Sequence, residues 1–146
     1  MSFCWKSVIF LVILRCNNTR KEESMLKIKN YVKVESLEEA YELNQKRTAC
    51  VLGGMVWLKM GSRNVTTAID LSGLGLDRIT ETEEEFVIGC MTPLRDLELH
   101  KGLDTYTNGA VRESLRHIVG VQFRNCATVG GSVWGRFGFS DVLTML

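Results

Sequence analysis

The stretch that decides the fold is QFRNCATVGG, residues Gln122–Gly131, which Ser140 and Asp141 follow a few positions later. Its pattern is that of a helix exit, a short apolar strand at Cys126–Val129 and a bare glycine pair. Two adjacent glycines carry no Cβ, so a ligand can approach their backbone N–H groups closely. Consecutive N–H groups of this kind bind anions, most often phosphate. The sequence therefore predicts a phosphate-binding turn at this glycine pair.

A second glycine pair, Gly53 and Gly54, follows an apolar strand in the upstream segment ACVLGGMVWLK, residues Ala49–Lys59. Two phosphate-binding turns suit a pyrophosphate that is held from both sides. Two familiar nucleotide sites do not fit the sequence. Residues Gly54–Lys59 lack the Gly-Lys-Ser/Thr ending of a P-loop, and no G-x-G-x-x-G motif of the Rossmann type follows a strand.

Both motifs resemble those of the FAD-binding subunits of molybdenum hydroxylases, the family of xanthine dehydrogenase and the carbon monoxide dehydrogenase medium subunit. CVLGGMVWLKM is similar to the first flavin motif of that family, and QFRNCATVGG with the later Ser-Asp is similar to the second. The resemblance covers Met25–Leu146. It implies an α+β fold of the PCMH type. A small βαβ parallel-sheet subdomain would occupy residues 25–75, and a second, incomplete α/β subdomain residues 76–146.

Local patterns in the first part of the chain agree with a βαβ unit. Ser36 and Glu39 form a capping box that opens a helix extending to about Gln45. A brief helix is expected at Met55–Met60, after the first glycine pair. Strands are expected at Tyr31–Val34, Ala49–Leu52 and Val65–Leu71.

The second part of the chain has a different character. A hairpin is expected from Asp77–Glu81 and Glu85–Gly89, around an acidic turn. Pro93 fits the first turn of a helix that Thr92 caps and that runs to about His100. Further helices are expected at Ala110–Ile118 and from Val142 to Leu146. Family members continue well beyond the position of Leu146, so the resemblance implies a chain that is truncated within the second subdomain.

The resemblance also implies which residues contact FAD. The first glycine segment and the second, with the Thr128 hydroxyl, would hold the pyrophosphate. Ile118 would stand beside the flavin ring, and the Asp141 carboxylate suits sugar hydroxyls, although it could equally cap the helix that begins at Val142. Arg124 is expected to brace the loop and not to touch FAD. The implied set is Val51, Leu52, Gly53, Gly54, Met55, Val56, Trp57, Ile118, Thr128, Gly130, Gly131 and Asp141.

Composition excludes several other functions. Apolar residues make up 45% of the 146 residues and charged residues 24%, with a net charge of +1, so nucleic acid and anionic membranes are not expected partners. The five cysteines are dispersed without a CxxC pair, and there are only two histidines. A metal site is therefore not expected, and the cysteine pattern favours a reducing cytoplasm. Residues 1–24 precede the family resemblance and are interpreted as an extension.

For function, the resemblance implies a flavoprotein subunit of a molybdopterin-dependent dehydrogenase or hydroxylase. Electrons would pass from [2Fe–2S] clusters of a small subunit through FAD to NAD or another acceptor, while a large subunit holds the molybdopterin. One alternative is a flavin domain like that of vanillyl-alcohol oxidase, but Met55–Lys59 lacks the His, Cys or Ser-rich loop expected there. The other alternative is a non-catalytic fragment that binds no FAD.

Overall fold

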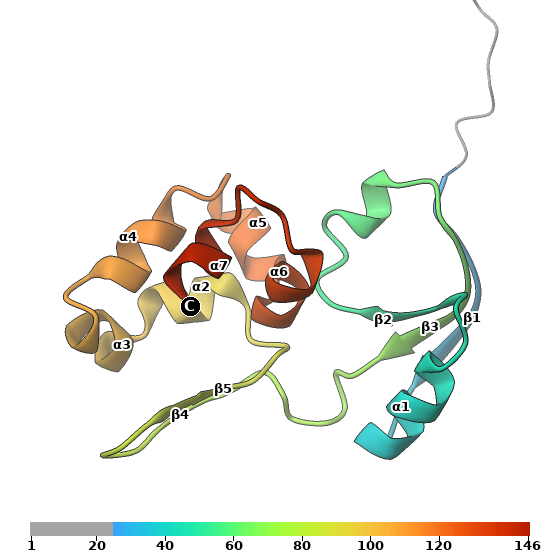
Figure 1. The fold of residues 1–146 in the computed structure, drawn as a ribbon, viewed down its shortest axis with the longest axis horizontal. Coiled ribbons are helices and arrows are strands. Elements are labelled where there is room, and N and C mark those ends of the chain that lie inside the picture. Colours follow the sequence, from blue (N-terminus) through green and yellow to red (C-terminus); the bar gives the residue numbers. More distant parts are fainter. Residues whose placement is uncertain (1–24) are drawn as a thin grey trace, which may run out of the picture.

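The structure, a computed structural model, describes residues 25–146; the proposed extension at residues 1–24 lies outside the described residues (Figure 1). A three-stranded parallel sheet forms from β1 (Lys27–Lys33), β2 (Ala49–Leu52) and β3 (Asn64–Asp70), in the order β1-β3-β2. Helix α1 (Leu37–Asn44) crosses from β1 to β2, and the short 3-10 helix η1 (Leu58–Met60) lies between β2 and β3. This arrangement, called the sheet unit below, confirms the predicted βαβ pattern.

The start of α1 shows why the chain leaves β1 as a helix. The Ser36 hydroxyl accepts a hydrogen bond from the Glu39 N–H at 3.1 Å, and the Glu39 carboxylate accepts one from the Glu35 N–H at 2.9 Å. These bonds satisfy N–H groups that the first helical turn leaves unpaired. Ala40 faces inward from α1 and packs with Ile69 of the central strand, which is fully buried.

The antiparallel hairpin of β4 (Ile79–Glu81) and β5 (Phe86–Ile88) follows the sheet unit and extends beneath the helices (Figure 1). Its turn is held by the Thr82 hydroxyl, which accepts hydrogen bonds from the N–H groups of Glu84 and Glu85. The hairpin confirms the expected pair of strands, although each is shorter than predicted.

Six short helices form a layer beside the sheet unit, called the helical layer below (Figure 1). Its core consists of inward-facing aliphatic side chains, among which Leu94, Leu97 and Leu115 are at most 1% exposed. The helices are α2 (Leu94–Leu99), α3 (Lys101–Tyr106), α4 (Ala110–Arg116), α5 (Val121–Cys126), α6 (Val129–Gly135) and α7 (Asp141–Met145).

The predicted strand at Cys126–Val129 is wrong. Helix α5 continues through Cys126, and α6 begins at Val129, so the second glycine pair lies in the first turn of a helix. Thr128 is the N-cap of α6 and its hydroxyl accepts the Gly131 N–H at 3.2 Å. A four-residue apolar run is too short for periodicity to separate strand from helix. The only strand-like feature there is a single bridge between Thr128 and Pro93.

In the sheet unit, β1 begins at Lys27 instead of Tyr31, and the brief helix begins at Leu58 instead of Met55. Three boundaries of the helical layer also differ from the prediction. Pro93 is itself the N-cap of α2, whereas the Thr92 hydroxyl donates to the Arg78 carbonyl at 3.3 Å. Helix α4 ends at Arg116, two residues before Ile118. Ser140, not Asp141, caps α7, because its hydroxyl accepts the Leu143 N–H. Of these three ends, only the start of α7 has a side-chain cap, and differences of one or two residues are common at helix termini.

The sheet unit and the helical layer meet where the two glycine pairs face each other. A Cβ placed on Gly54 would overlap the backbone carbonyl of Cys126, and one placed on Gly53 would lie 2.8 Å from the Thr128 hydroxyl oxygen and 3.6 Å from the Gly131 Cα. These approaches are possible only because neither glycine carries a side chain. The backbones of two segments distant in sequence therefore touch directly, and this contact is called the glycine junction below.

Replacing Gly54 with Ala tests the glycine junction. The added methyl group meets a backbone carbonyl that cannot rotate away, so we expect the free energy of unfolding to fall by about 1–3 kcal/mol. Urea denaturation of the full chain, followed by circular dichroism, measures this difference. Gly138→Ala is the matched control, since nothing lies within 4 Å of its Cβ position. Equal stability of the two variants would contradict the junction.

Candidate functional site

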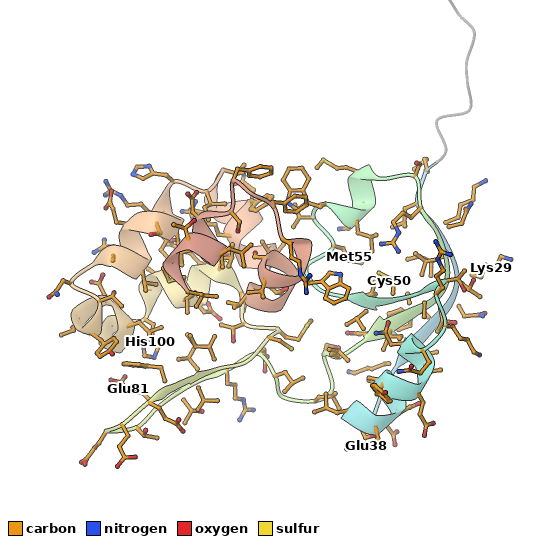
Figure 2. All side chains as sticks on the ribbon, in the orientation of Figure 1. Lys29, Glu38, Cys50, Met55, Glu81 and His100 are labelled. Carbon is orange, nitrogen blue, oxygen red and sulfur yellow. The ribbon has the colours of Figure 1, made fainter. Side chains whose placement is uncertain are left out.

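The loop after β2 presents a run of backbone donors at the glycine junction. Within residues 25–146, the N–H groups of Gly53, Gly54, Met55 and Val56 donate to no protein acceptor. Met55 has φ +58°, a left-handed conformation that is uncommon for a residue with a side chain. Such a residue bends consecutive N–H groups into a concave anion site. The side of the sheet unit on which Met55 lies faces the helical layer (Figure 2).

The second glycine pair differs, because its N–H groups already have partners. The Gly130 N–H donates to the Cys90 carbonyl at 2.8 Å, and the Gly131 N–H to the Thr128 hydroxyl. A Cβ on Gly130 would lie only 2.7 Å from the Cys90 carbonyl oxygen. In this structure Gly130 and Gly131 therefore permit close backbone contact, and the unpaired donors belong to the first loop alone.

The donor set fits the pyrophosphate of FAD. Phosphate oxygens accept hydrogen bonds from backbone N–H groups, and four such groups stand consecutively in Gly53–Val56. The Thr128 hydroxyl adds a fifth polar group, since it accepts from Gly131 and keeps its own proton to donate. No charged side chain is required for this arrangement, because the backbone dipoles supply the positive potential.

The remaining residues of the first motif divide between the core and an aromatic cluster. Leu52 is buried and Met55 packs on the same small core. Val56 packs against the core of the helical layer, so the loop reaches across the junction. The Trp57 ring lies 5.6 Å from the Phe137 ring, between centroids, and Phe137 stacks on Phe139 at 5.3 Å.

Two predicted residues lie apart from the glycines along the helical layer. Ile118 is half-buried against the helical core, just after α4. Asp141 is exposed as the first residue of α7. Val51, on the edge strand β2, is 39% exposed. The structure thus brings Gly53 close to Thr128 and Gly131, and Gly54 close to the backbone of Cys126 and Ala127.

Glu98 is a polar residue of this region that the sequence analysis did not single out. It is buried on α2, where its carboxylate accepts hydrogen bonds from Arg124 and Arg95, each at 2.7 Å. Burial by itself raises the pKa of Glu98, but the hydrogen bonds from Arg124 and Arg95 outweigh it and hold the pKa below its usual value. The ion pair therefore persists at pH values where an exposed glutamate would protonate. The sequence signal for this buried ion pair is a glutamate next to the inward-facing leucines of a helix.

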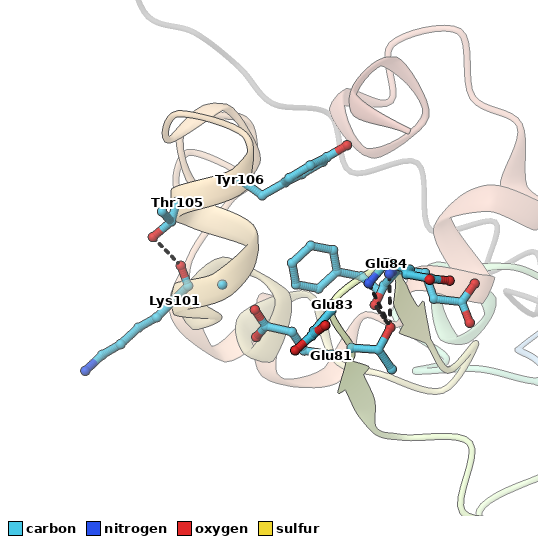
Figure 3. Close-up of a pocket in the computed structure, with 10 residues that line it drawn as sticks. Glu81, Glu83, Glu84, Lys101, Thr105 and Tyr106 are labelled. Atoms are coloured by element: carbon cyan, nitrogen blue, oxygen red, sulfur yellow. Dashed lines mark hydrogen bonds between the residues drawn. The ribbon is translucent and has the colours of Figure 1, made fainter.

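A cavity lies elsewhere, between the β4–β5 hairpin and α3 (Figure 3). Its volume is about 810 Å³. Glutamates line much of it, and such a wall repels phosphate. The cavity is therefore not the site of a pyrophosphate. Within residues 25–146 no cluster of His, Cys, Asp or Glu is arranged to hold a metal, and no helix there is both long and apolar enough to span a membrane.

Solved structures with the same fold include carbon monoxide dehydrogenases and a quinoline 2-oxidoreductase. A carbon monoxide dehydrogenase from Hydrogenophaga pseudoflava is 28% identical, with a TM-score of 0.61, over 71% of this chain and 38% of that one. Quinoline 2-oxidoreductase from Pseudomonas putida 86 is 18% identical, with a TM-score of 0.64, over 75% and 40%. Carbon monoxide dehydrogenase from Oligotropha carboxidovorans is 24% identical, with a TM-score of 0.62, over 73% and 39%.

This chain thus spans less than half the length of the solved chains that it matches. No curated protein sequence matches it significantly. The model of the FAD-binding domain in molybdopterin dehydrogenases matches residues 24–146, which is nearly all of the chain and includes both glycine motifs. On this match and the shared fold, the chain belongs to the FAD-binding domain family of molybdopterin dehydrogenases.

Proposed function

We propose that this chain binds the pyrophosphate of FAD at the glycine junction and forms the flavin-bearing part of a molybdopterin-dependent dehydrogenase or hydroxylase. The observation that carries the proposal is the row of four unpaired N–H groups in Gly53–Val56, next to the second glycine pair. Gly53, Gly54, Met55 and Val56 are half-buried, and N–H groups shielded from solvent are costly unless water or a ligand accepts their hydrogen bonds. A diphosphate is negatively charged and has enough oxygens to accept hydrogen bonds from all four N–H groups.

Each residue of the proposed site has a definite task. Gly53 to Val56 bind the phosphate oxygens through their N–H groups, while Thr128 adds its hydroxyl from the opposite side. Gly131 lies across the junction from Gly53, so the lack of a side chain there leaves room beside the first loop, whereas Gly130 lets α6 pack closely on the Cys90 carbonyl. The exposed rings of Trp57 and Phe137 pack against each other where the first loop ends. Ile118 is proposed to contact the flavin ring, and Asp141 the sugar hydroxyls. Val51 and Leu52 contribute backbone only.

FAD, when bound, would supply the redox chemistry by linking one-electron donors to a two-electron acceptor. The chain itself needs no catalytic acid, base or nucleophile and acts by binding and orienting. We propose [2Fe–2S] clusters of a small subunit as electron donors, a large molybdopterin subunit as the substrate-oxidising partner, and NAD or a similar molecule as acceptor. Support comes from the family of the chain and from its likeness to carbon monoxide dehydrogenase and quinoline 2-oxidoreductase. A cytoplasmic location agrees with Cys50, Cys90 and Cys126 remaining free thiols.

Flavin titration tests the pyrophosphate site directly. We expect the full chain to bind FAD at least about tenfold more tightly than FMN, which lacks the second phosphate and the adenosine, since about 1.4 kcal/mol of lost contact accounts for that ratio. Quenching of flavin fluorescence during titration with each compound measures both dissociation constants. Equal affinities for FAD and FMN would show that the glycine junction contributes little to binding. If neither compound binds, the proposed function is wrong.

Thr128 offers a second test within the same site. Thr128→Val keeps the shape of the side chain but removes the hydroxyl, so we expect FAD to bind about tenfold more weakly, as for loss of a hydrogen bond to a charged group. Thr128→Ser retains the hydroxyl and serves as the matched control, with an affinity close to that of the unmodified chain. Thermal unfolding without FAD separates the loss of the α6 cap from the loss of binding. Identical FAD affinities for the two variants would exclude Thr128 from the site.

A further inference from the structure

One buried side chain connects two distant parts of the helical layer. Arg124 on α5 is 5% exposed, and its Nε donates to the Glu98 carboxylate of α2 at 2.7 Å. Its Nη1 donates to the backbone carbonyl of Ile118 at 2.9 Å. The planar guanidinium makes both bonds at once, because its donors point in fixed, diverging directions. Arg124 therefore ties the turn after α4 to the core helix α2.

The turn that Arg124 holds is strained. Val119, which follows Ile118, has φ +49°, and a β-branched residue in this left-handed region is a conformational outlier. The Val119 side chain is 77% exposed, so packing around it does not explain the conformation. Strained backbone of this kind persists where surrounding contacts enforce it, and it occurs disproportionately at functional sites. The bond from Arg124 to the Ile118 carbonyl is such a contact.

We propose that Arg124 is a positioning residue, which holds the Ile118–Gly120 turn rigidly beside the flavin ring and so sets the polarity that the ring meets, with Glu98 as its anchor. This inference rests on the proposed function, because it takes the Ile118 side chain as the neighbour of the flavin. An apolar side chain that is locked in place keeps water away from the ring. Water would favour the more highly charged, reduced form of the flavin. A loosened turn admits water and thereby stabilises the reduced flavin.

A core ion pair without any effect on the flavin is the alternative, and Arg95 provides the control for it. Arg95 binds the same Glu98 carboxylate at 2.7 Å, but it is 28% exposed and makes no contact with the Ile118 carbonyl. Removing Arg95 weakens the anchor and leaves the bond from Arg124 to Ile118 intact. If the ion pairs are purely structural, replacing either arginine changes the stability of the chain but not the properties of the flavin. A positioning role predicts that only Arg124 changes the flavin.

The experiment compares Arg124→Lys, Arg95→Gln and Val119→Gly in the full chain loaded with FAD. Lysine keeps the positive charge but lacks the planar guanidinium with its diverging N–H donors, so it cannot bind the Glu98 carboxylate and the Ile118 carbonyl at the same time. Val119→Gly relaxes the turn from the surface without touching the buried ion pair, and so tests the turn even where Arg124→Lys folds poorly. The readouts are the visible absorption band of bound flavin, its reduction potential, and the unfolding midpoint without FAD.

We expect Arg124→Lys to increase the affinity for reduced FAD about tenfold relative to that for oxidised FAD. This change raises the two-electron reduction potential of the bound flavin by about 30 mV. Val119→Gly shifts the band and the potential in the same direction, by less, without lowering the unfolding midpoint. Arg95→Gln leaves both flavin readouts unchanged. If neither Arg124→Lys nor Val119→Gly changes the absorption band or the potential of the flavin, the positioning role is overturned and the proposed function stands. The same holds if Arg95→Gln shifts the potential as much as Arg124→Lys does. Failure of the unmodified chain to bind FAD overturns the proposed function as well.

Discussion

The structure depends on a contact between two backbones. At the glycine junction the loop after β2 lies against the segment between α5 and α6, with the Gly54 Cα directed at the Cys126 carbonyl. Side chains normally separate packed elements, and their removal brings the two segments close enough to share one ligand. This approach also fixes the orientation of the sheet unit against the helical layer, because Val56 continues from the junction into the helical core.

The two glycine pairs look alike in sequence but do different work. The first pair opens a loop, Gly53–Val56, whose N–H groups have no partner among residues 25–146. The second pair lies in the first turn of a helix, and its N–H groups donate to Cys90 and Thr128. The difference follows from local capping, because Thr128 offers its hydroxyl to the helix that begins after it. A donor that already serves the fold is not free for a ligand, so the first loop carries the larger share of anion binding in the proposed site.

Much of the sheet unit could be predicted from the sequence, because β2 and β3 are apolar runs between clear turn signals and α1 begins with a capping box. The helical layer was harder to predict. Its six helices have at most seven residues each, which is too short for periodicity to reveal. The sequence predicts no helix at α3 or α6, and at α5 it predicts only a helix exit before a strand. The glycine motifs located the site, but the pairing of Arg124 with Glu98 spans 26 positions and depends on tertiary packing. A single sequence carries no local signal for such a pair.

The strand order of the sheet unit has a consequence for how the chain is assembled during synthesis. Among residues 25–146, strands β1 and β2 each pair with β3 alone, and β3 is the last of the three to leave the ribosome. Until residues 64–70 emerge, neither earlier strand has its partner in the sheet. A nascent chain that ends before β3 therefore carries two strands with unpaired edges, which are vulnerable to aggregation.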